Sequence, residues 1–426
     1  MTSPMHARQS YALVVVAVTF LALLAAAGVR SAPGVLIVPW ESAFGWERST
    51  ISLAAGLGIF LYGLMGPFAG ALMQSLGVRR TLGGALALMS LAAFLSLFMR
   101  EPWQLIVTWG VLSGIGSGCV AFVLAATIVN RWFISHRGLV MGLLAASTAT
   151  GNLIFLPVLA KLSEAGGWQP VVIAVALATG VLVPLVLWLL PERPADIGTQ
   201  PFGAVEGAHI EPPQAPANPV WLALSTLLMA ARHRNFWLLF ATFFICGFTT
   251  NGLIGTHLIA MCGDYAIPAV TAASLMAMMG LFDLVGTTAS GWLTDRYDSR
   301  WLLFCYYGLR GLSLIYLPYS DFTFYGLSMF AVVYGLDWIA TVPPTLRLTT
   351  QTFGDRAAPI VFGWVAAGHQ LGAAIAALSG GVLRTAFGSY FEALMLAGAA
   401  GLVAAILSLW IGPAPGNGEL RTVAAA

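Results

Sequence analysis

Charged residues are scarce in this sequence. Only 8% of its 426 residues are Asp, Glu, Lys or Arg, whereas 59% are hydrophobic. Soluble domains carry about 25% charged residues, so this composition excludes a soluble globular protein. The formal net charge of +2 is also too small to favour binding to nucleic acid.

Cysteine is equally rare, with four residues at unrelated spacings. They match neither a metal-binding pattern nor a disulfide framework, and we interpret each as a small buried hydrophobic residue. The sequence shows no phosphate loop, zinc cluster or nucleophile triad. The glycine run at 114–118 lies in an apolar segment, without the strand–turn–helix context of a dinucleotide site. We therefore expect neither enzyme activity nor a cofactor.

The sequence does contain apolar runs of about 20 residues, long enough to cross a ~30 Å hydrocarbon layer as helices. The first run could be mistaken for a signal peptide, but it is longer than a signal core and eleven more runs follow. Hydropathy predicts twelve membrane spans, at 11–30, 50–73, 81–99, 104–128, 138–160, 169–190, 236–257, 270–293, 301–319, 322–346, 358–380 and 389–412.

The second half of the chain repeats the first at a constant offset of 221 residues. Gly291 falls on Gly70, Gly335 on Gly114, and the match continues without a shift through four further hydrophobic segments. This predicts two six-helix halves in the same orientation, 1–190 and 236–426. Between them, 191–235 is rich in proline and glycine, and we expect a solvated linker with little secondary structure.

The distribution of basic residues predicts the topology. With twelve spans, both termini lie on one side of the membrane, and 13 arginines fall on that side. Five basic residues fall on the other side: Arg30, Arg48, Arg100, Lys161 and Arg384. Cytoplasmic loops carry the excess of positive charge, so we expect cytoplasmic termini and a cytoplasmic linker in a multi-pass protein of the cell membrane.

The turn Gly291–Arg300 resembles the loop signature of the major facilitator superfamily, and Gly70–Arg80 is its counterpart in the first half. In the first copy Gln74 replaces the Asp of the signature. Parallel six-helix repeats are also the architecture of that superfamily. The resemblance covers nearly the whole chain and implies an all-α membrane fold, a monomer, and transport by alternating access.

Three stretches resemble the monocarboxylate porter and oxalate:formate antiporter branch: Phe44–Ser52, Arg131–Leu139 and Pro194–Gly198. That branch commonly places an Asp and an Arg one turn apart in span 8. Here Asp283 is followed four residues later by Thr287. The arginine that anchors an anion in the branch is therefore missing from this position.

Four ionisable residues fall near the middle of predicted spans, namely Asp283, Arg310, Asp337 and His369. A charge at the bilayer centre costs about 3 kcal/mol on insertion scales, so each needs an explanation. All four are in the second half, and the offset places neutral residues at the same levels of the first. The repeated fold does not itself require them.

Polar residues at helical spacing accompany two of these groups. Spans 8 and 10 each carry one stripe: Asp283, Thr287, Ser290 and Thr294, and Tyr334, Asp337, Thr341 and Thr345. We expect each stripe to face a cavity or another helix. The resemblance places spans 7, 8, 10 and 11 around the central cavity and span 9, with Arg310, outside it.

We predict that Asp283 and Asp337 couple transport to protons. The residues predicted to bind substrate are His369, Arg310, Tyr62, Asn152, Asn251 and Thr287. Structural alternatives remain open at this stage. Asp283 could form a structural bridge with Arg310, Asp337 could cap or pair locally, and His369 could be a packing residue.

These features predict a secondary active transporter that moves a small organic solute, with a carboxylate favoured, by proton-coupled alternating access. The alternative is efflux of amphipathic compounds, which the aromatic content and the missing arginine in span 8 favour. A non-transporting sensor is disfavoured because no soluble output domain accompanies the spans. The expected partners are the solute, protons and the lipid bilayer.

Overall fold

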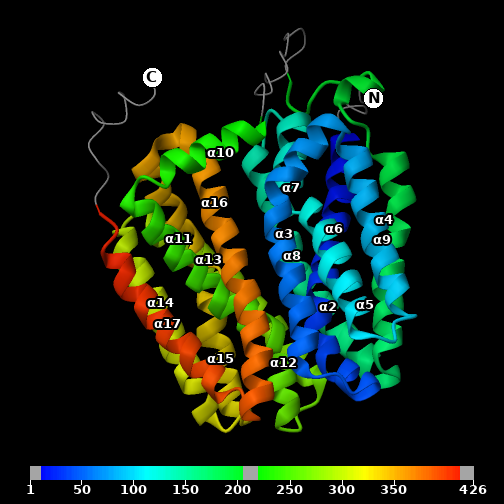
Figure 1. Cartoon of the computed structure of the whole chain (residues 1–426). Coiled ribbons are helices and arrows are strands. Elements are labelled where there is room, and N and C mark those ends of the chain that lie inside the picture. Colours follow the sequence, from blue (N-terminus) through cyan, green and yellow to red (C-terminus); the bar gives the residue numbers. More distant parts are fainter. Residues whose placement is uncertain (1–10, 205–218, 413–426) are drawn as a thin grey trace. The chain divides into compact units, whose positions relative to one another are not determined.

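The computed structural model describes residues 11–204 and 219–412 (Figure 1). Within these ranges, the side chains at 67, 122, 148, 149, 152, 219, 355 and 356 are not among the described parts. Ten helices in the described residues are long and apolar enough to cross a membrane. Helices coincide with all twelve predicted spans, which confirms the all-α membrane fold.

The described chain forms two units. The first comprises the residues up to Trp46 and those from Leu57 to Val220. Its elements are α2 (Tyr11–Phe44), α3 (Arg48–Ser75), α4 (Val78–Ser96), α5 (Pro102–Leu105), η1 (Ile106–Leu112), α6 (Ser113–Cys119), α7 (Phe122–Trp132), α8 (Arg137–Gly166), α9 (Trp168–Leu189) and η2 (Pro194–Ile197).

The second unit comprises 47–56, at the start of α3, and the residues from Trp221 onward. Its elements are α10 (Pro219–Ala230, from Trp221), α11 (Arg234–Gly247), η3 (Phe248–Ile254), α12 (Gly255–Asp264), α13 (Ala269–Thr294), α14 (Ser299–Tyr316), η4 (Leu317–Ser320), α15 (Phe324–Asp337), α16 (Val342–Phe387) and α17 (Phe391–Leu409). Within α16, Gly354 has a non-helical backbone, so this element contains two spans.

Equivalent helices pack through equivalent contacts in the two units. A Cβ atom added to Gly114 would meet Gly58 and Leu61, and one added to Gly335 would meet Met279 and Phe282. These pairs are related by the offset of 221 residues. Gly180 against Ser90 and Gly401 against Gly311 are related in the same way. The repeat predicted from sequence is therefore present in three dimensions.

Spans 4 and 10 are interrupted at equivalent depths. In the first unit, α6 ends at Cys119 and α7 begins at Phe122; in the second, α15 ends at Asp337 and α16 begins at Val342. Pro343 and Pro344 open α16, and proline lacks the N–H group that a continuous helix needs. Interrupted helices are the usual place for binding sites in transporters of this architecture.

Helix α2 is longer than the predicted first span. It continues from Tyr11 to Phe44 with Pro33 and Pro39 inside it. At 1.5 Å per residue, Arg30 lies about 4 Å beyond the middle of this helix. The prediction that the first span ends near residue 30, which placed Arg30 at the membrane surface, was therefore wrong. Prolines are tolerated inside membrane helices, so they did not mark its end.

The linker also differs from the prediction. Residues 219–230 form helix α10, whereas we expected little secondary structure. The segment PVWLALSTLLMA contains one proline, at the first helical position, and its other residues are apolar apart from Ser225 and Thr226. The proline- and glycine-rich composition of the whole linker concealed this local apolar run. Cys305 is a second correction, because it is exposed on α14 rather than buried in the protein.

The turns that carry the loop signature are held by carboxylates. In the first unit, Glu192 accepts hydrogen bonds from the backbone N of Val78 (2.7 Å) and Arg79 (2.9 Å) and pairs with Arg131 at 3.4 Å. Glu192 therefore supplies the carboxylate that Gln74 lacks.

In the second unit, Asp298 caps α14 by accepting from Arg300 N. The hydrogen bond from the Arg300 side chain lowers the pKa of the Asp298 carboxyl. Arg347 contacts both Asp295, at 3.8 Å, and the carbonyl of Thr294. The first copy of the signature is thus tied to a neighbouring segment by hydrogen bonds to Glu192, and the second by the ion pair of Asp295 with Arg347.

Two glycines of α13 test the packing of α13 against α15. A Cβ at Gly286 would overlap the carbonyl of Leu336, whereas one at Gly280 would meet nothing within 4 Å. We expect Gly286→Ala to lower the melting temperature of the purified protein, at a cost of about 1–3 kcal/mol or more from overpacking. Gly280→Ala is the matched control and should cost nothing, since Ala is the better helix former. Equal melting temperatures of the two variants would contradict this packing of α13 against α15.

Candidate functional site

The interruption of span 10 leaves backbone groups without helical partners in a segment that crosses the membrane. Residues 338–341 form turns between α15 and α16. Lipid offers no hydrogen bonds, so these backbone groups must be satisfied by the protein. The side chains that do so are the polar residues identified in spans 8 and 9.

Arg310 of α14 binds the end of α15. Its Nε donates to Asp337 Oδ2 at 2.5 Å, and its Nη2 donates to the carbonyls of Asp337 (2.5 Å) and Trp338 (3.2 Å). Arg310 is 1% exposed and Asp337 is 4% exposed. The guanidinium therefore neutralises the carboxylate and satisfies two carbonyls that the helix interruption frees.

Asp283 of α13 binds the same interruption from another side. Its Oδ1 accepts from the backbone N of Ile339 at 2.9 Å and from Thr287 Oγ1 at 2.9 Å. One turn further on, Ser290 Oγ donates to the carbonyl of Ala340 at 2.5 Å. The polar stripe of span 8 thus faces span 10. This agrees with the expectation that the stripe faces either a cavity or another helix.

This arrangement decides against one structural alternative for Arg310. We considered a structural bridge between Asp283 and Arg310, but the ion pair of Arg310 is with Asp337. In the described part of the chain Asp283 makes no ion pair within 4 Å. A sequence offers no means of choosing between two carboxylates on neighbouring helices.

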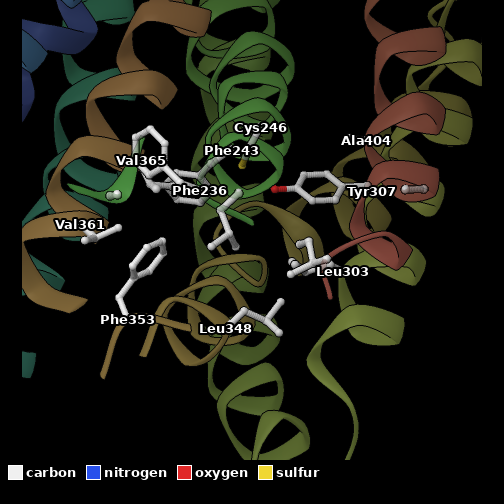
Figure 2. Packing of buried hydrophobic residues seen from close by; sticks show 14 residues of the cluster. Phe236, Phe243, Cys246, Leu303, Tyr307, Leu348, Phe353, Val361, Val365 and Ala404 are labelled. Carbon is white, nitrogen blue, oxygen red and sulfur yellow. The ribbon is translucent and has the colours of Figure 1, made fainter. Parts of the chain in front are cut away.

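A thiol and an imidazole adjoin the ion pair. Cys246 Sγ of α11 accepts from Arg310 Nη1 at 2.9 Å and lies 3.3 Å from Thr341 Oγ1. His369 of α16 lies beside Cys246, half-buried, with its ring 5.0 Å from that of Phe243. Figure 2 shows the Tyr307 hydroxyl directed toward Cys246 within the hydrophobic cluster of this unit. Polar groups therefore continue from the ion pair to α16.

One carboxylate oxygen of Asp337 has no hydrogen-bond partner among the described residues. Its Oδ2 is bound to Arg310, but its buried Oδ1 has no hydrogen-bond partner among the described residues. The Tyr334 hydroxyl, one turn earlier, donates to the carbonyl of Thr249 at 2.5 Å. The polar stripe of span 10 is thus fully buried and largely satisfied, apart from this oxygen.

The first unit contains a partly buried arginine inside a membrane span. Arg30 of α2 lies over the ring of Tyr62 of α3, with its guanidinium carbon 4.8 Å from the ring centroid. Its Nη1 is buried and has no hydrogen-bond partner among the described residues. A guanidinium stacked on an aromatic face, with donors to spare, is suited to bind an anion in a planar, bidentate manner.

Sequence reasoning missed Arg30, although the repeat contained a signal for it. The offset of 221 places Arg30 at the level of Asn251, which was selected as a candidate, and Tyr62 at the level of Asp283. Asn251 is half-buried in η3, and the side chain of Asn152 lies outside the described residues. Applying the offset of 221 residues to Asn251 identifies Arg30 as the equivalent candidate residue in the first half.

Comparison with known proteins identifies the family. The model of the Major Facilitator Superfamily matches residues 19–336 and 253–424, so the chain belongs to this superfamily. It is a multi-pass membrane transporter and not an enzyme.

Several relatives match most of the chain, and two of them follow. An uncharacterised transporter of this type from Bacillus subtilis, YcxA, is 25% identical over 85% of this chain and 86% of its own length. Monocarboxylate transporter 13 of Rattus norvegicus is 27% identical over 87% of this chain and 82% of its own. Both matches include the two repeats.

The fold is also that of solved transporters. The inward-open xylose transporter XylE of E. coli has a TM-score of 0.72 at 12% identity and covers 97% of this chain and 99% of its own. This similarity supports the architecture and carries no information on the solute.

The pairing in the second unit gives a direct test. We expect Arg310→Gln and Asp337→Asn each to lower stability by about 3–5 kcal/mol, because each leaves its partner buried without a counter-charge. The double variant Arg310→Gln/Asp337→Asn should recover monodisperse protein in size-exclusion chromatography. Combining Arg310→Gln with Asp283→Asn is the control and should give no recovery. Recovery in that control instead would contradict the observed pairing.

Proposed function

We propose that this transporter carries a small organic carboxylate together with a proton, and that Arg30 binds the carboxylate group. One observation carries the proposal: Arg30 is an arginine near the middle of a membrane helix whose Nη1 is buried and unpaired. The similarity to monocarboxylate transporters supports the same class of solute.

The chemistry of the two arginines inside membrane spans, Arg310 and Arg30, differs. Arg310 is neutralised by Asp337 and bound to carbonyls, so it has little capacity for another anion. Arg30 has no ion pair within the described residues, and a charge without a counter-ion in a membrane is costly. A carboxylate would supply that counter-ion in the bidentate geometry that guanidinium groups favour. This provides the anchor that Thr287 does not.

The proton is assigned to Asp283. Its Oδ1 holds the backbone N–H of Ile339 in the interruption of span 10, and no cation contacts it in the described part of the chain. Protonation would weaken this charge-assisted bond and so change how firmly α13 holds the interrupted helix. Asp337 is the less suitable proton carrier because its charge is already paired with Arg310.

The remaining assignments follow from this mechanism. The two repeats would rock about a midplane site, with His369 and Thr287 contributing polar contacts next to the interruption. We place the protein in the cell membrane as a monomer, with cytoplasmic termini, on the basis of the arginine distribution. With Arg30 moved into the membrane, that bias becomes stronger.

Efflux of amphipathic compounds is the competing function, and a solute screen separates the two. In proteoliposomes with an imposed pH gradient, we expect uptake of short carboxylates and none of cationic dyes. A neutral amide of the same shape as a transported acid should also be excluded, because it cannot pair with Arg30. Transport of the dyes without the acids would overturn the proposal.

The role of Arg30 predicts a graded series. Arg30→Gln should raise the concentration for half-maximal uptake of the carboxylate at least tenfold, which corresponds to about 1.4 kcal/mol or more. Arg30→Lys should retain part of the affinity, since it keeps the charge but not the planar fork. Arg100→Gln, at an exposed loop position, is the control and should match the unmodified protein. Unchanged affinity in Arg30→Gln would exclude this residue as the anchor.

The role of Asp283 predicts a separation of two activities. Asp283→Asn preserves the shape of the side chain and an acceptor for Ile339 N, but it cannot release a proton. We expect uptake driven by a pH gradient to be lost, while exchange of internal for external carboxylate continues. If pH-driven uptake persists in this variant, the proton is carried elsewhere.

A further inference from the structure

Helix α10 has an apolar surface on both of its sides. One side packs on the hydrophobic cluster of the second unit through Leu227, Met229 and Ala230. The other side is exposed, with Trp221 63% and Leu228 62% accessible and Leu224 between them on the same face. The 12 residues of α10 contain no charge. Apart from Ser225 and Thr226 its residues are apolar, and a helix with apolar residues on opposite sides is suited to the core of a protein or to lipid.

The length of α10 excludes a membrane span. Twelve residues extend about 18 Å, whereas the hydrocarbon core is about 30 Å thick. Two indole hydrogen bonds fix the helix and its end: Trp364 Nε1 donates to the carbonyl of Ala223 (2.9 Å), and Trp237 Nε1 donates to that of Ala231 (2.8 Å). Figure 1 shows α10 at the end of the second unit where α11 begins. Its exposed face therefore lies at the level where the membrane spans begin.

Positive charge follows the apolar face directly. Arg232 and Arg234 are both exposed, and neither makes an ion pair with a described residue. Trp237, one turn further on, is 54% exposed, and tryptophan is enriched at membrane interfaces. An apolar helix face next to unpaired arginines matches the chemistry of an anionic lipid surface, with acyl chains below and phosphate groups above.

We propose that α10 is an interfacial helix whose exposed face lies in the lipid leaflet, and that Arg232 and Arg234 bind the headgroups of anionic phospholipids. The linker between the two halves is thereby anchored to the membrane at its second end. This site is independent of the solute site and of its assignment.

A fluorescent label tests the position of the helix. In a Cys305→Ser background, which removes the exposed native thiol, Leu228→Cys carries an environment-sensitive NBD label in nanodiscs. Gln200→Cys, an exposed position in the polar part of the linker, carries the control label. We expect nitroxide lipids to quench the label at 228 and aqueous iodide to spare it, with the reverse at 200. Equal quenching of both labels by iodide would overturn the proposal.

The charge requirement is tested with the same label. Phosphatidylglycerol in the nanodisc should increase the lipid quenching at 228 relative to phosphatidylcholine alone. Arg232→Gln/Arg234→Gln should abolish that increase, and Arg232→Lys/Arg234→Lys should retain it. Arg79→Gln/Arg80→Gln removes two exposed arginines elsewhere and should leave the increase unchanged.

Four results would contradict this site. Phosphatidylglycerol could have no effect, or its effect could persist in the Gln double variant. Inorganic phosphate added to phosphatidylcholine nanodiscs could reproduce the increase, which would assign the arginines to a soluble anion. Iodide protection found only in nanodiscs that hold two copies would assign the apolar face to a second copy of the chain.

Discussion

A membrane-spanning helix that is interrupted inside the bilayer must have its freed backbone groups satisfied by other parts of the protein. The interruption between α15 and α16 meets this constraint with three side chains from two other helices. Arg310 binds the carbonyls of Asp337 and Trp338, Asp283 binds the N–H of Ile339, and Ser290 binds the carbonyl of Ala340. Charged and polar residues in three spans are therefore explained by one feature of the backbone.

The same constraint distinguishes the two arginines inside membrane spans. Arg310 is enclosed by groups of its own unit and completes the structure there. Arg30 rests on Tyr62 and keeps a buried donor free, which is unfavourable unless a ligand fills the position. Among the described residues, no charged side chain forms a hydrogen bond or ion pair with the first interruption, between Cys119 and Phe122, so the two repeats share a fold but differ in the polar groups at this level. This asymmetry supports a proton site in one unit and a solute site in the other.

Much of the fold could be predicted because the sequence features that specify it are long apolar runs and a repeat of half the chain. Twelve apolar runs and an offset of 221 residues specify two six-helix repeats, and the glycine contacts obey the same offset. The end of α2 could not be predicted, since Pro33 and Pro39 are tolerated inside it. Helix α10 was concealed by the composition of the surrounding linker.

The candidate site was predicted in part. The sequence identified Asp283, Arg310 and Asp337 because intramembrane charges are rare, but it could not pair them. Pairing depends on the rotation of α13, α14 and α15 about their axes, which hydropathy does not specify. Arg30 was missed because its placement depended on the helix end. Because α2 ends at Phe44, Arg30 is also a rare charge inside a membrane span.

Hydrogen–deuterium exchange across the interruption of span 10 tests the central claim most directly. In Asp283→Val the N–H of Ile339 loses its acceptor, whereas Thr288→Val, on the same helix, removes only a bond to the backbone of its own helix. The account predicts faster exchange at residues 338–341 in Asp283→Val, unchanged exchange there in Thr288→Val, and unchanged exchange in α17 in both. Full protection of 338–341 in Asp283→Val would contradict it.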